Sequence, residues 1–447
     1  MFNNIFKWLV ASPPRTLAIG FAFIIALGSF LLQLPAAASD GQPTRYIDAL
    51  FTATSATCVT GLVVVDTGDH YSTFGQAVIL VMIQIGGLGF MSMATLFAFF
   101  LKRRISLKER LILQEALNQG SIEGIVRLVR RVVLYALSIE AAGALVFSLR
   151  FLRDMSPGRA IYYGVFHAVS FFNNAGFDLM GSFRSLTVYV DDPWVNLVTM
   201  ALIVTGGLGF VVLADLTDMR RGRRLSLHSK VVLTMSGSLI LFGALVIFAF
   251  EYSNPGTMKP LDTGTKILSA FMQSVGPRTA GVNTLDLPAL RQATQFFIIL
   301  LMFIGASPGS TGGGIKTTTF AALLGAVWAI IRGREDVVMF KYRLAQERVY
   351  KALTLTLLAV ALVLTATMIL STTEDHHFLM ILFEVVSAFG TVGLTLGLTA
   401  DLSLFGKIVI MLMMFMGRLG PLTLGYALVP RRDKVLYREA EGKIIIG

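Results

Sequence analysis

The sequence predicts an all-α polytopic membrane protein built from four similar repeats, each with a span, a short half-helix and a second span. Hydrophobic residues make up 55% of the 447-residue chain and charged residues only 15%, whereas a soluble protein carries about 25% charged residues. The mean hydropathy is +0.71. Apolar stretches near the ~20 residues that cross a bilayer recur along the whole chain. We therefore expect no separate soluble domain.

Eight segments are apolar and long enough to be spans. They are residues 15–35, 74–101, 129–149, 194–216, 231–250, 293–331, 350–370 and 405–429, and the sixth is interrupted. The first is long for the apolar part of a signal peptide, so we interpret it as a retained span.

Basic residues gather in a few short segments between the spans, around residues 102–110, 127–131, 220–230, 332–351 and 431–438. Residues 36–48, 62–73 and 177–193 carry one Lys or Arg at most. This distribution follows the positive-inside rule. It predicts a multi-pass protein of the cell membrane with both termini in the cytoplasm, and it argues against nucleic acid as the reason for the net charge of +11.

Four shorter apolar segments lie between paired spans and share a frame in which Phe precedes Gly by ten residues. The pairs are Phe51 and Gly61, Phe166 and Gly176, Phe271 and Gly281, and Phe383 and Gly393. Three of the four have Ser at the fourth step. These segments are too short to cross, so we interpret them as re-entrant half-helices that begin near Pro43, Pro157, Asp262 and Asp375. The predicted repeats are 1–101, 102–217, 218–332 and 333–447.

The glycine strand after each half-helix suits the chemistry of a monovalent cation. Such an ion must exchange its water for protein oxygens, and glycine allows the backbone angles that turn successive carbonyls toward one axis. The half-helix ends would point negative partial charge at the ion. The alternative is that the glycines only permit close helix packing. The predicted oxygen donors are the backbones of Thr57, Cys58, Val59, Thr60, Gly61, Asn173, Asn174, Ala175, Gly176, Arg278, Thr279, Ala280, Gly281, Gly390, Thr391, Val392 and Gly393. They predict a pseudo-four-fold central pore.

The third repeat departs from the others because a glycine-rich stretch interrupts its second span. Ile315 separates Gly314 from Lys316, so the stretch misses the phosphate-loop spacing and no nucleotide is expected in this chain. We interpret residues 305–316 as an intramembrane gating loop, with a simple helix break as the alternative. The predicted gate residues are Gly305, Ala306, Ser307, Pro308, Gly309, Ser310, Thr311, Gly312, Gly313, Gly314, Lys316 and Arg418.

Arg418 is included because it lies deep in the last apolar segment, where a charge is costly and usually functional. We expect it to face the water-filled path. The alternative is a structural pair with a carboxylate such as Glu140 or Asp215. Two further sets of glycines, Gly86-Gly-Leu-Gly89 and Gly206-Gly-Leu-Gly209, are interpreted as close packing points inside spans.

These motifs resemble the superfamily of Trk, Ktr and HKT potassium transport proteins, and within it the KtrB-type membrane subunit. The resemblance covers essentially the whole chain and rests on Ala53-Thr-Ser-Ala-Thr-Cys-Val-Thr-Gly-Leu62, Phe172-Asn-Asn-Ala-Gly-Phe177, Pro277-Arg-Thr-Ala-Gly281 and Gly417-Arg-Leu-Gly-Pro-Leu-Thr423. It implies that Gly61, Gly176, Gly281 and Gly393 are filter glycines, that residues 305–316 are the intramembrane loop and that Arg418 is the pore arginine.

The resemblance also implies a homodimer with one pore per subunit, seated on a cytosolic nucleotide-binding regulatory ring similar to KtrA. The basic loops 102–131 and 218–230 would suit docking of that ring, although topology alone also requires their charge. The ion would be K⁺. Each strand has one shared glycine and lacks the Thr-Val-Gly-Tyr-Gly run of potassium channels, so we expect modest discrimination against Na⁺, which is a second candidate ion.

Two other classes of membrane protein are alternatives to an ion pathway. A sodium-coupled secondary transporter of a small solute would explain a broken helix at the midplane, but inverted halves predict a matching second break. An enzyme is not expected, because no Ser/His/Asp set, carboxylate pair or metal cluster sits at a suitable depth. The single cysteine, Cys58, excludes an internal disulfide.

Overall fold

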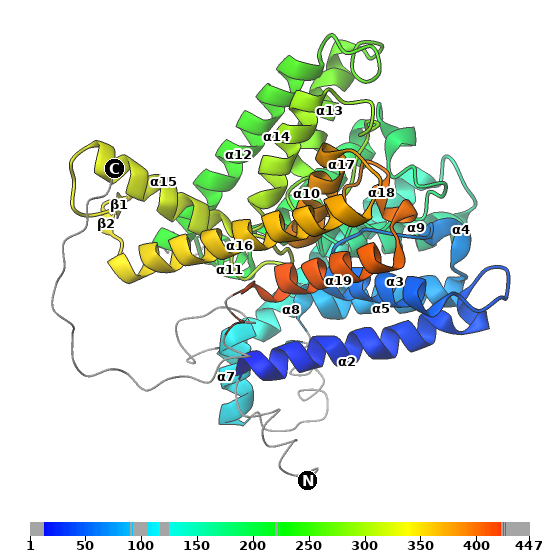
Figure 1. The fold of residues 1–447 in the computed structure, drawn as a ribbon, viewed down its shortest axis with the longest axis horizontal. Coiled ribbons are helices and arrows are strands. Elements are labelled where there is room, and N and C mark those ends of the chain that lie inside the picture. Colours follow the sequence, from blue (N-terminus) through cyan, green and yellow to red (C-terminus); the bar gives the residue numbers. More distant parts are fainter. Residues whose placement is uncertain are drawn as a thin grey trace.

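The computed structural model describes residues 13–89, 92, 106–116, 125–219, 222, 224–421, 423 and 425, which fold mainly into helices (Figure 1). Parts of the predicted basic loop 102–131, of the span 74–101 and of the C-terminal tail lie outside these residues. Four helices among the described residues have 21 or more residues and, at about 1.5 Å per residue, reach across the hydrocarbon layer. They are α2 (Pro13–Gln33), α8 (Ile125–Phe151), α12 (Leu227–Glu251) and α16 (Gln346–Thr373).

A half-helix follows each long helix and packs against it. The half-helices are α3 (Tyr46–Cys58), α9 (Pro157–Phe172), α13 (Thr263–Val275) and α17 (Phe378–Gly390). Pro157 occupies the first turn of α9, and the Asp262 carboxylate caps α13 by accepting from the backbone of Gly264 and Thr265, as predicted. The predicted starts at Pro43 and Asp375 are wrong. The backbone stays non-helical through Arg45 and His377, which delays the first turn of α3 and α17.

The second helices of the first, second and fourth repeats are shorter than predicted, whereas that of the third repeat ends at the predicted interruption. The four second helices are α5 (Thr73–Leu88), α10 (Pro193–Leu208), α14 (Gln292–Phe303) and α19 (Leu404–Leu419). Glycines with positive φ end three of them, namely Gly89 at 82°, Gly209 at 93° and Gly420 at 83°, because a residue with positive φ cannot continue a right-handed helix. After Gly209 the chain continues as α11 (Phe210–Met219), turned by 100°. The prediction of uninterrupted spans over 194–216 and 405–429 is therefore wrong.

In the third repeat the break is longer, because residues 304–316 separate α14 from α15 (Thr317–Ile331). The remaining described elements are short. They are η1 (Pro35–Ala37), α4 (Thr67–His70), α7 (Leu107–Ala116), η2 (Thr187–Tyr189), α18 (Leu398–Asp401) and the strands β1 (Val338–Met339) and β2 (Tyr342–Arg343). The two strands form an antiparallel hairpin in which Met339 pairs with Tyr342.

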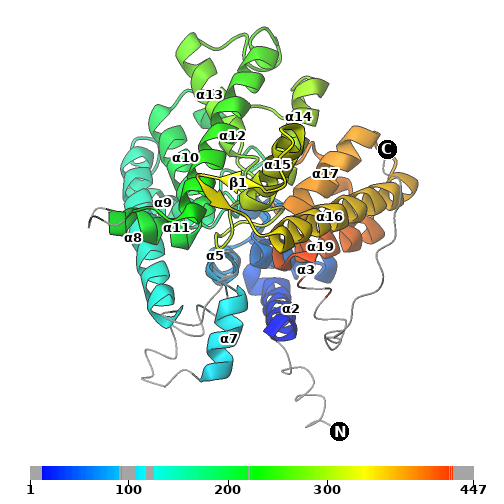
Figure 2. The same cartoon turned by 90° about the vertical axis from the view of Figure 1, so that its left-hand side faces the viewer.

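The four repeats surround a common centre, as Figure 2 shows with α8–α11, α12–α15, α16–α19 and α2–α5 placed in turn around it. The half-helices supply the core, and Phe51, Phe166 and Phe383 of the shared frame are fully buried. Apolar side chains also cover the outside, for example Phe23 and Met368, which are 67% and 71% exposed. An apolar surface around a buried core is the arrangement that a lipid environment requires, and the predicted membrane fold is confirmed.

Candidate cation pathway

The four strands that follow the half-helices share one backbone conformation. The residue two positions before each glycine has a left-handed φ: 58° at Val59, 58° at Asn174, 68° at Thr279 and 50° at Thr391. The glycines that follow are also left-handed, at 90°, 71°, 62° and 98° for Gly61, Gly176, Gly281 and Gly393. Such angles are rare for residues other than glycine, and strained for a β-branched residue such as Val59. Their recurrence in all four repeats shows that the repeats share a strand geometry.

These strands form a closed ring. A Cβ atom on Gly61 would stand against the carbonyl oxygen of Ala175, one on Gly176 against Ala280, one on Gly281 against Val392, and one on Gly393 against Thr60. In every case the distance would be 2.5 Å or less, which no side chain tolerates. Each glycine thus lies against the strand of the next repeat, and the fourth repeat returns to the first.

The serine of the shared frame braces the strand in repeats one, two and four. The backbone N–H of Gly61 donates to Ser55 Oγ at 3.1 Å, and that of Gly393 donates to Ser387 Oγ at 3.1 Å. Ser170 Oγ instead donates to the carbonyl of Phe177 at 2.6 Å. Val275 stands at this position in repeat three, and the N–H of Gly281 donates to the carbonyl of Gly276. The side chains therefore fix the strands without entering the ring.

The ring is buried and lies at the C-terminal ends of the four half-helices. Thr60, Ala175, Ala280 and Val392 are all 0% exposed. Helix C-termini carry negative partial charge, so four of them favour a cation at the centre. No group of three His, Cys, Asp or Glu side chains that could hold a metal occurs in the part of the chain that the structure describes. The oxygens that could hold an ion here are backbone carbonyls.

Some of the predicted oxygen donors already make contacts with other parts of the protein. The carbonyl of Arg278 accepts from Asn174 Nδ2 at 3.2 Å, and the carbonyl of Thr57 lies against Gly86. Gly206 and Gly417 receive the carbonyls of Phe172 and Phe389 in the same way. Gly86 and Gly206, two of the glycines interpreted as packing points, are thus confirmed as close contacts with the last turn of the half-helix in their own repeats. Gly87 and Gly209 instead lie against other repeats, at Asn173 and Pro308, and Gly89 makes no close contact.

Residues 304–316 contact three of the four strands. The N–H of Gly313 donates to Thr391 Oγ1 at 2.9 Å, and Thr311 Oγ1 donates to Asn174 Oδ1 at 3.3 Å. A Cβ on Gly312 would collide with Thr279 Oγ1. Asn174, Thr279 and Thr391 are the left-handed residues of their strands, so the segment lies directly against the ring.

Arg418 connects this segment to the first repeat. Its guanidinium donates to the carbonyls of Thr311, Gly86 and Gly87. A carboxylate partner was the alternative, but Glu140 instead accepts from Gln84 and Asn173, and Asp215 accepts from Ser226 and Ser229. Lys316 Nζ donates to the carbonyls of Gly312 and Gly313 at 2.7 and 3.2 Å. Two cationic side chains therefore hold the segment through backbone oxygens.

The predicted strand residues and the predicted gate residues lie far apart in the sequence, and the structure brings both sets together at one centre. The polar network of Gln84, Glu140 and Asn173 was not predicted. In it, Asn173 Nδ2 donates to Gln84 Oε1 and Glu140 Oε1, both at 2.9 Å. The only sequence signal for it was polar residues at apolar depth.

A family model described as TrkH, cation transport protein, matches residues 20–431. The chain belongs to the TrkH family. This confirms the resemblance to the Trk, Ktr and HKT superfamily. Ktr system potassium uptake protein B of Bacillus subtilis is 45% identical over 100% of this chain and 99% of its own length. Potassium/sodium uptake protein NtpJ of Enterococcus hirae is 40% identical over 98% of this chain and 97% of its own.

The fold also matches a solved member of the TrkH family. The crystal structure of the potassium transporter TrkH from Vibrio parahaemolyticus superposes with a TM-score of 0.70 at 20% identity. The match covers 92% of this chain and 85% of the other. At that identity the comparison establishes the shared fold.

Proposed function

We propose that this chain is the membrane-spanning, ion-translocating subunit of a potassium uptake system. The single observation that supports it most is the closed ring in which the glycine of each repeat lies against a carbonyl of the next. A ring of carbonyls can replace the hydration shell of a cation. The relatives named as potassium uptake proteins match the chain over nearly its full length, so K⁺ is the proposed ion.

The ring acts as the selectivity filter in this proposal. Its donors are the backbone carbonyls of the four strands, with those of Thr60, Ala175, Ala280 and Val392 at the level of the glycines. Na⁺ is proposed as a second transported ion, because one relative is named a potassium/sodium uptake protein and because the strands differ in sequence.

Residues 305–316 act as the gate. The support is their contact with Asn174, Thr279 and Thr391 and the bonds that Arg418 makes to Thr311 and to the first repeat. Opening requires the segment to leave these side chains. Its glycines and the lack of helix between Ile304 and Lys316 make such a movement feasible.

Regulation is proposed to come from outside the chain. The subunit assembles as a homodimer with one pore per subunit, on a cytosolic nucleotide-binding ring that contacts the basic loops 102–131 and 218–230. The name "Ktr system" of the relatives supports a system of more than one protein. The cytoplasmic orientation of both termini rests on the charge distribution.

Flux measurements in liposomes test the proposal. Purified protein is reconstituted, and K⁺, Rb⁺, Na⁺ and Li⁺ gradients are compared with and without a small organic solute. K⁺ and Rb⁺ flux above Na⁺ flux, independent of solute, is the expected result. Uptake of the solute driven by a Na⁺ gradient without K⁺ flux would instead support the secondary transporter. The structure argues against that alternative, because the four-fold recurrence of strand geometry differs from two inverted halves.

A second experiment addresses the gate. Deletion of residues 308–313 removes the contacts that Thr311 and Gly312 make with Asn174 and Thr279 of the strands. It is expected to raise K⁺ flux. Elution of the variant from a sizing column at the wild-type volume shows intact folding. Lower flux in a folded variant would exclude the segment as an obstruction.

A further inference from the structure

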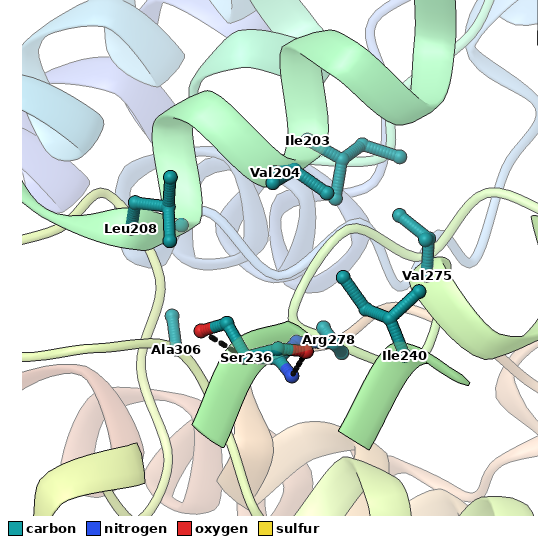
Figure 3. Close-up of a pocket in the computed structure, with 9 residues that line it drawn as sticks. Ile203, Val204, Leu208, Ser236, Ile240, Val275, Arg278 and Ala306 are labelled. Atoms are coloured by element: carbon teal, nitrogen blue, oxygen red, sulfur yellow. Dashed lines mark hydrogen bonds between the residues drawn. The ribbon is translucent and has the colours of Figure 1, made fainter. Parts of the chain in front are cut away.

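A small cavity lies between the second and third repeats, behind the strand that ends at Gly281. Figure 3 shows Ile203, Val204 and Leu208 of α10 on one side, with Ile240 and Val275 across from them. Arg278 and Ser236 lie on the side opposite α10. The open space is about the size of one water molecule. Apart from Arg278 and Ser236, the side chains that line it are apolar.

The Arg278 guanidinium has no anionic partner among the described residues. The side chain is 8% exposed. Nη1 donates to the carbonyl of Ser236 at 3.3 Å and Nη2 donates to Ser236 Oγ at 3.2 Å. A guanidinium has five N–H donors and stays protonated, so two bonds to a neutral residue leave donors unused and the charge uncompensated. An isolated buried charge is strongly unfavourable.

A single water would satisfy this site poorly. Buried waters make two to four hydrogen bonds, and the lining offers few polar atoms beyond the guanidinium itself. An anion balances the positive charge of the Arg278 guanidinium and also accepts hydrogen bonds from its unused N–H groups. Val204 and Ile240 are half-buried, so the cavity lies close to the apolar exterior.

We propose that this cavity is an anion site in which Arg278 holds one small monovalent anion. The anion is a halide, or the carboxylate head of a fatty acid whose chain remains in the bilayer. Both present a single negative charge to the guanidinium and need no other polar contact. The proposed ion pathway uses the backbone of Arg278 but not its side chain, and Ala306 of the proposed gate lies in the cavity wall.

An anion here would also affect the ring, because Thr279 follows Arg278 directly. Neutralising the guanidinium removes a positive charge from the side of the cation path. This consequence rests on the proposed function, whereas binding of the anion does not, so the binding experiments below can fail or succeed independently of transport.

Diffraction distinguishes the two sources. Crystals are grown with potassium bromide, and in parallel without halide, in potassium gluconate with added laurate. An anomalous bromine peak beside the Arg278 guanidinium supports the halide, and elongated density ending there in the second crystals supports the carboxylate. Absence of both features would overturn the proposal.

Thermal unfolding of delipidated protein provides the solution measurement, with K⁺ and ionic strength held constant. The midpoint is expected to rise saturably as chloride or laurate replaces gluconate, because a ligand that binds the folded state stabilises it. Equal midpoints in all three anions would contradict the proposal.

Three variants make this measurement specific. Arg278→Gln removes the charge, and Ile240→Phe fills the cavity while keeping Arg278, so both are expected to lose the saturable rise. Ser236→Ala keeps the charge and the cavity and is expected to retain it. If Arg278→Gln does not fold, Ile240→Phe still tests the proposal. A saturable rise of the unfolding midpoint that persists in Ile240→Phe would show that the anion binds elsewhere.

Discussion

The carbonyl oxygen of Thr60 lies 2.2 Å from the position that a Cβ atom of Gly393 would take, and this contact closes the ring of four strands. Thr60 belongs to the first repeat and Gly393 to the last, so the first and last repeats meet at the centre. A linear array of repeats would leave the first and fourth strands apart. The contact therefore identifies a single axis shared by all four repeats.

Substitution of a ring glycine tests the close approach. Gly281→Ser and Gly393→Ser place a Cβ against the carbonyls of Val392 and Thr60, and the positive φ adds about 1–2 kcal/mol of strain. We expect the ring to distort and the K⁺ to Na⁺ flux ratio to fall by about tenfold, which corresponds to ~1.4 kcal/mol. The measurement is flux of each ion in liposomes.

Gly237→Ala is the matched control for the ring glycines. Gly237 lies in α12, has no positive φ, and a Cβ there would meet nothing within 4 Å. The control is expected to keep the wild-type flux ratio and to be slightly more stable, since Ala favours a helix over Gly. Unchanged selectivity in both ring variants would count against the filter.

The serine braces provide a second test. Ser387→Ala leaves the N–H of Gly393 without its partner, at a cost of about 1–3 kcal/mol for a buried donor. We expect a lower thermal unfolding midpoint and weaker discrimination against Na⁺. Ser253→Ala is the control, because Ser253 accepts only an exposed bond from Arg291. An equal loss of stability in both variants would show that Ser387 is no special support for the strand.

Arg418 is expected to hold the gate closed. Arg418→Gln removes the charge that connects the carbonyls of Thr311, Gly86 and Gly87. Release of the segment predicts K⁺ flux several-fold above wild type, because the positive charge also opposes cations near the path. Arg418→Lys keeps the charge with fewer donors and is expected to fall between the two. Flux below wild type in a folded Arg418→Gln variant would contradict this role.

Asp178, at one end of the second strand, is expected to make K⁺ flux depend on pH. It lies in the loop between α9 and α10, where burial raises its pKa to about 6, with a smaller contribution from the Asp66 charge. The carboxyl is neutral below that pKa and negatively charged above it, so it attracts cations only at higher pH. K⁺ flux at low K⁺ concentration is expected to rise between about pH 5 and 7.

Asp178→Asn is the corresponding variant. It keeps the size of the side chain and removes its titration, so flux is expected to be low and flat over the same pH range. A wild-type pH profile in this variant would assign the titration to another group.

The sequence predicted the fold and the ring because both depend on patterns that repeat. The Phe–Gly frame marks where each half-helix and strand must lie, and the closing of the ring follows from four copies. The breaks at Gly89 and Gly209 were missed, because a positive φ depends on the three-dimensional path and a glycine inside an apolar run is also compatible with a helix. The partners of Arg418 could not be predicted either, because they are backbone carbonyls, which every residue type has.

The most direct test of the central claim is the position of the permeating ion. Anomalous diffraction from crystals grown in rubidium chloride locates Rb⁺, which substitutes for K⁺. A peak on the axis between the carbonyls of Thr60, Ala175, Ala280 and Val392 is the predicted result. Ordered Rb⁺ elsewhere in the protein, with the ring empty at saturating concentration, would contradict a filter made of these strands.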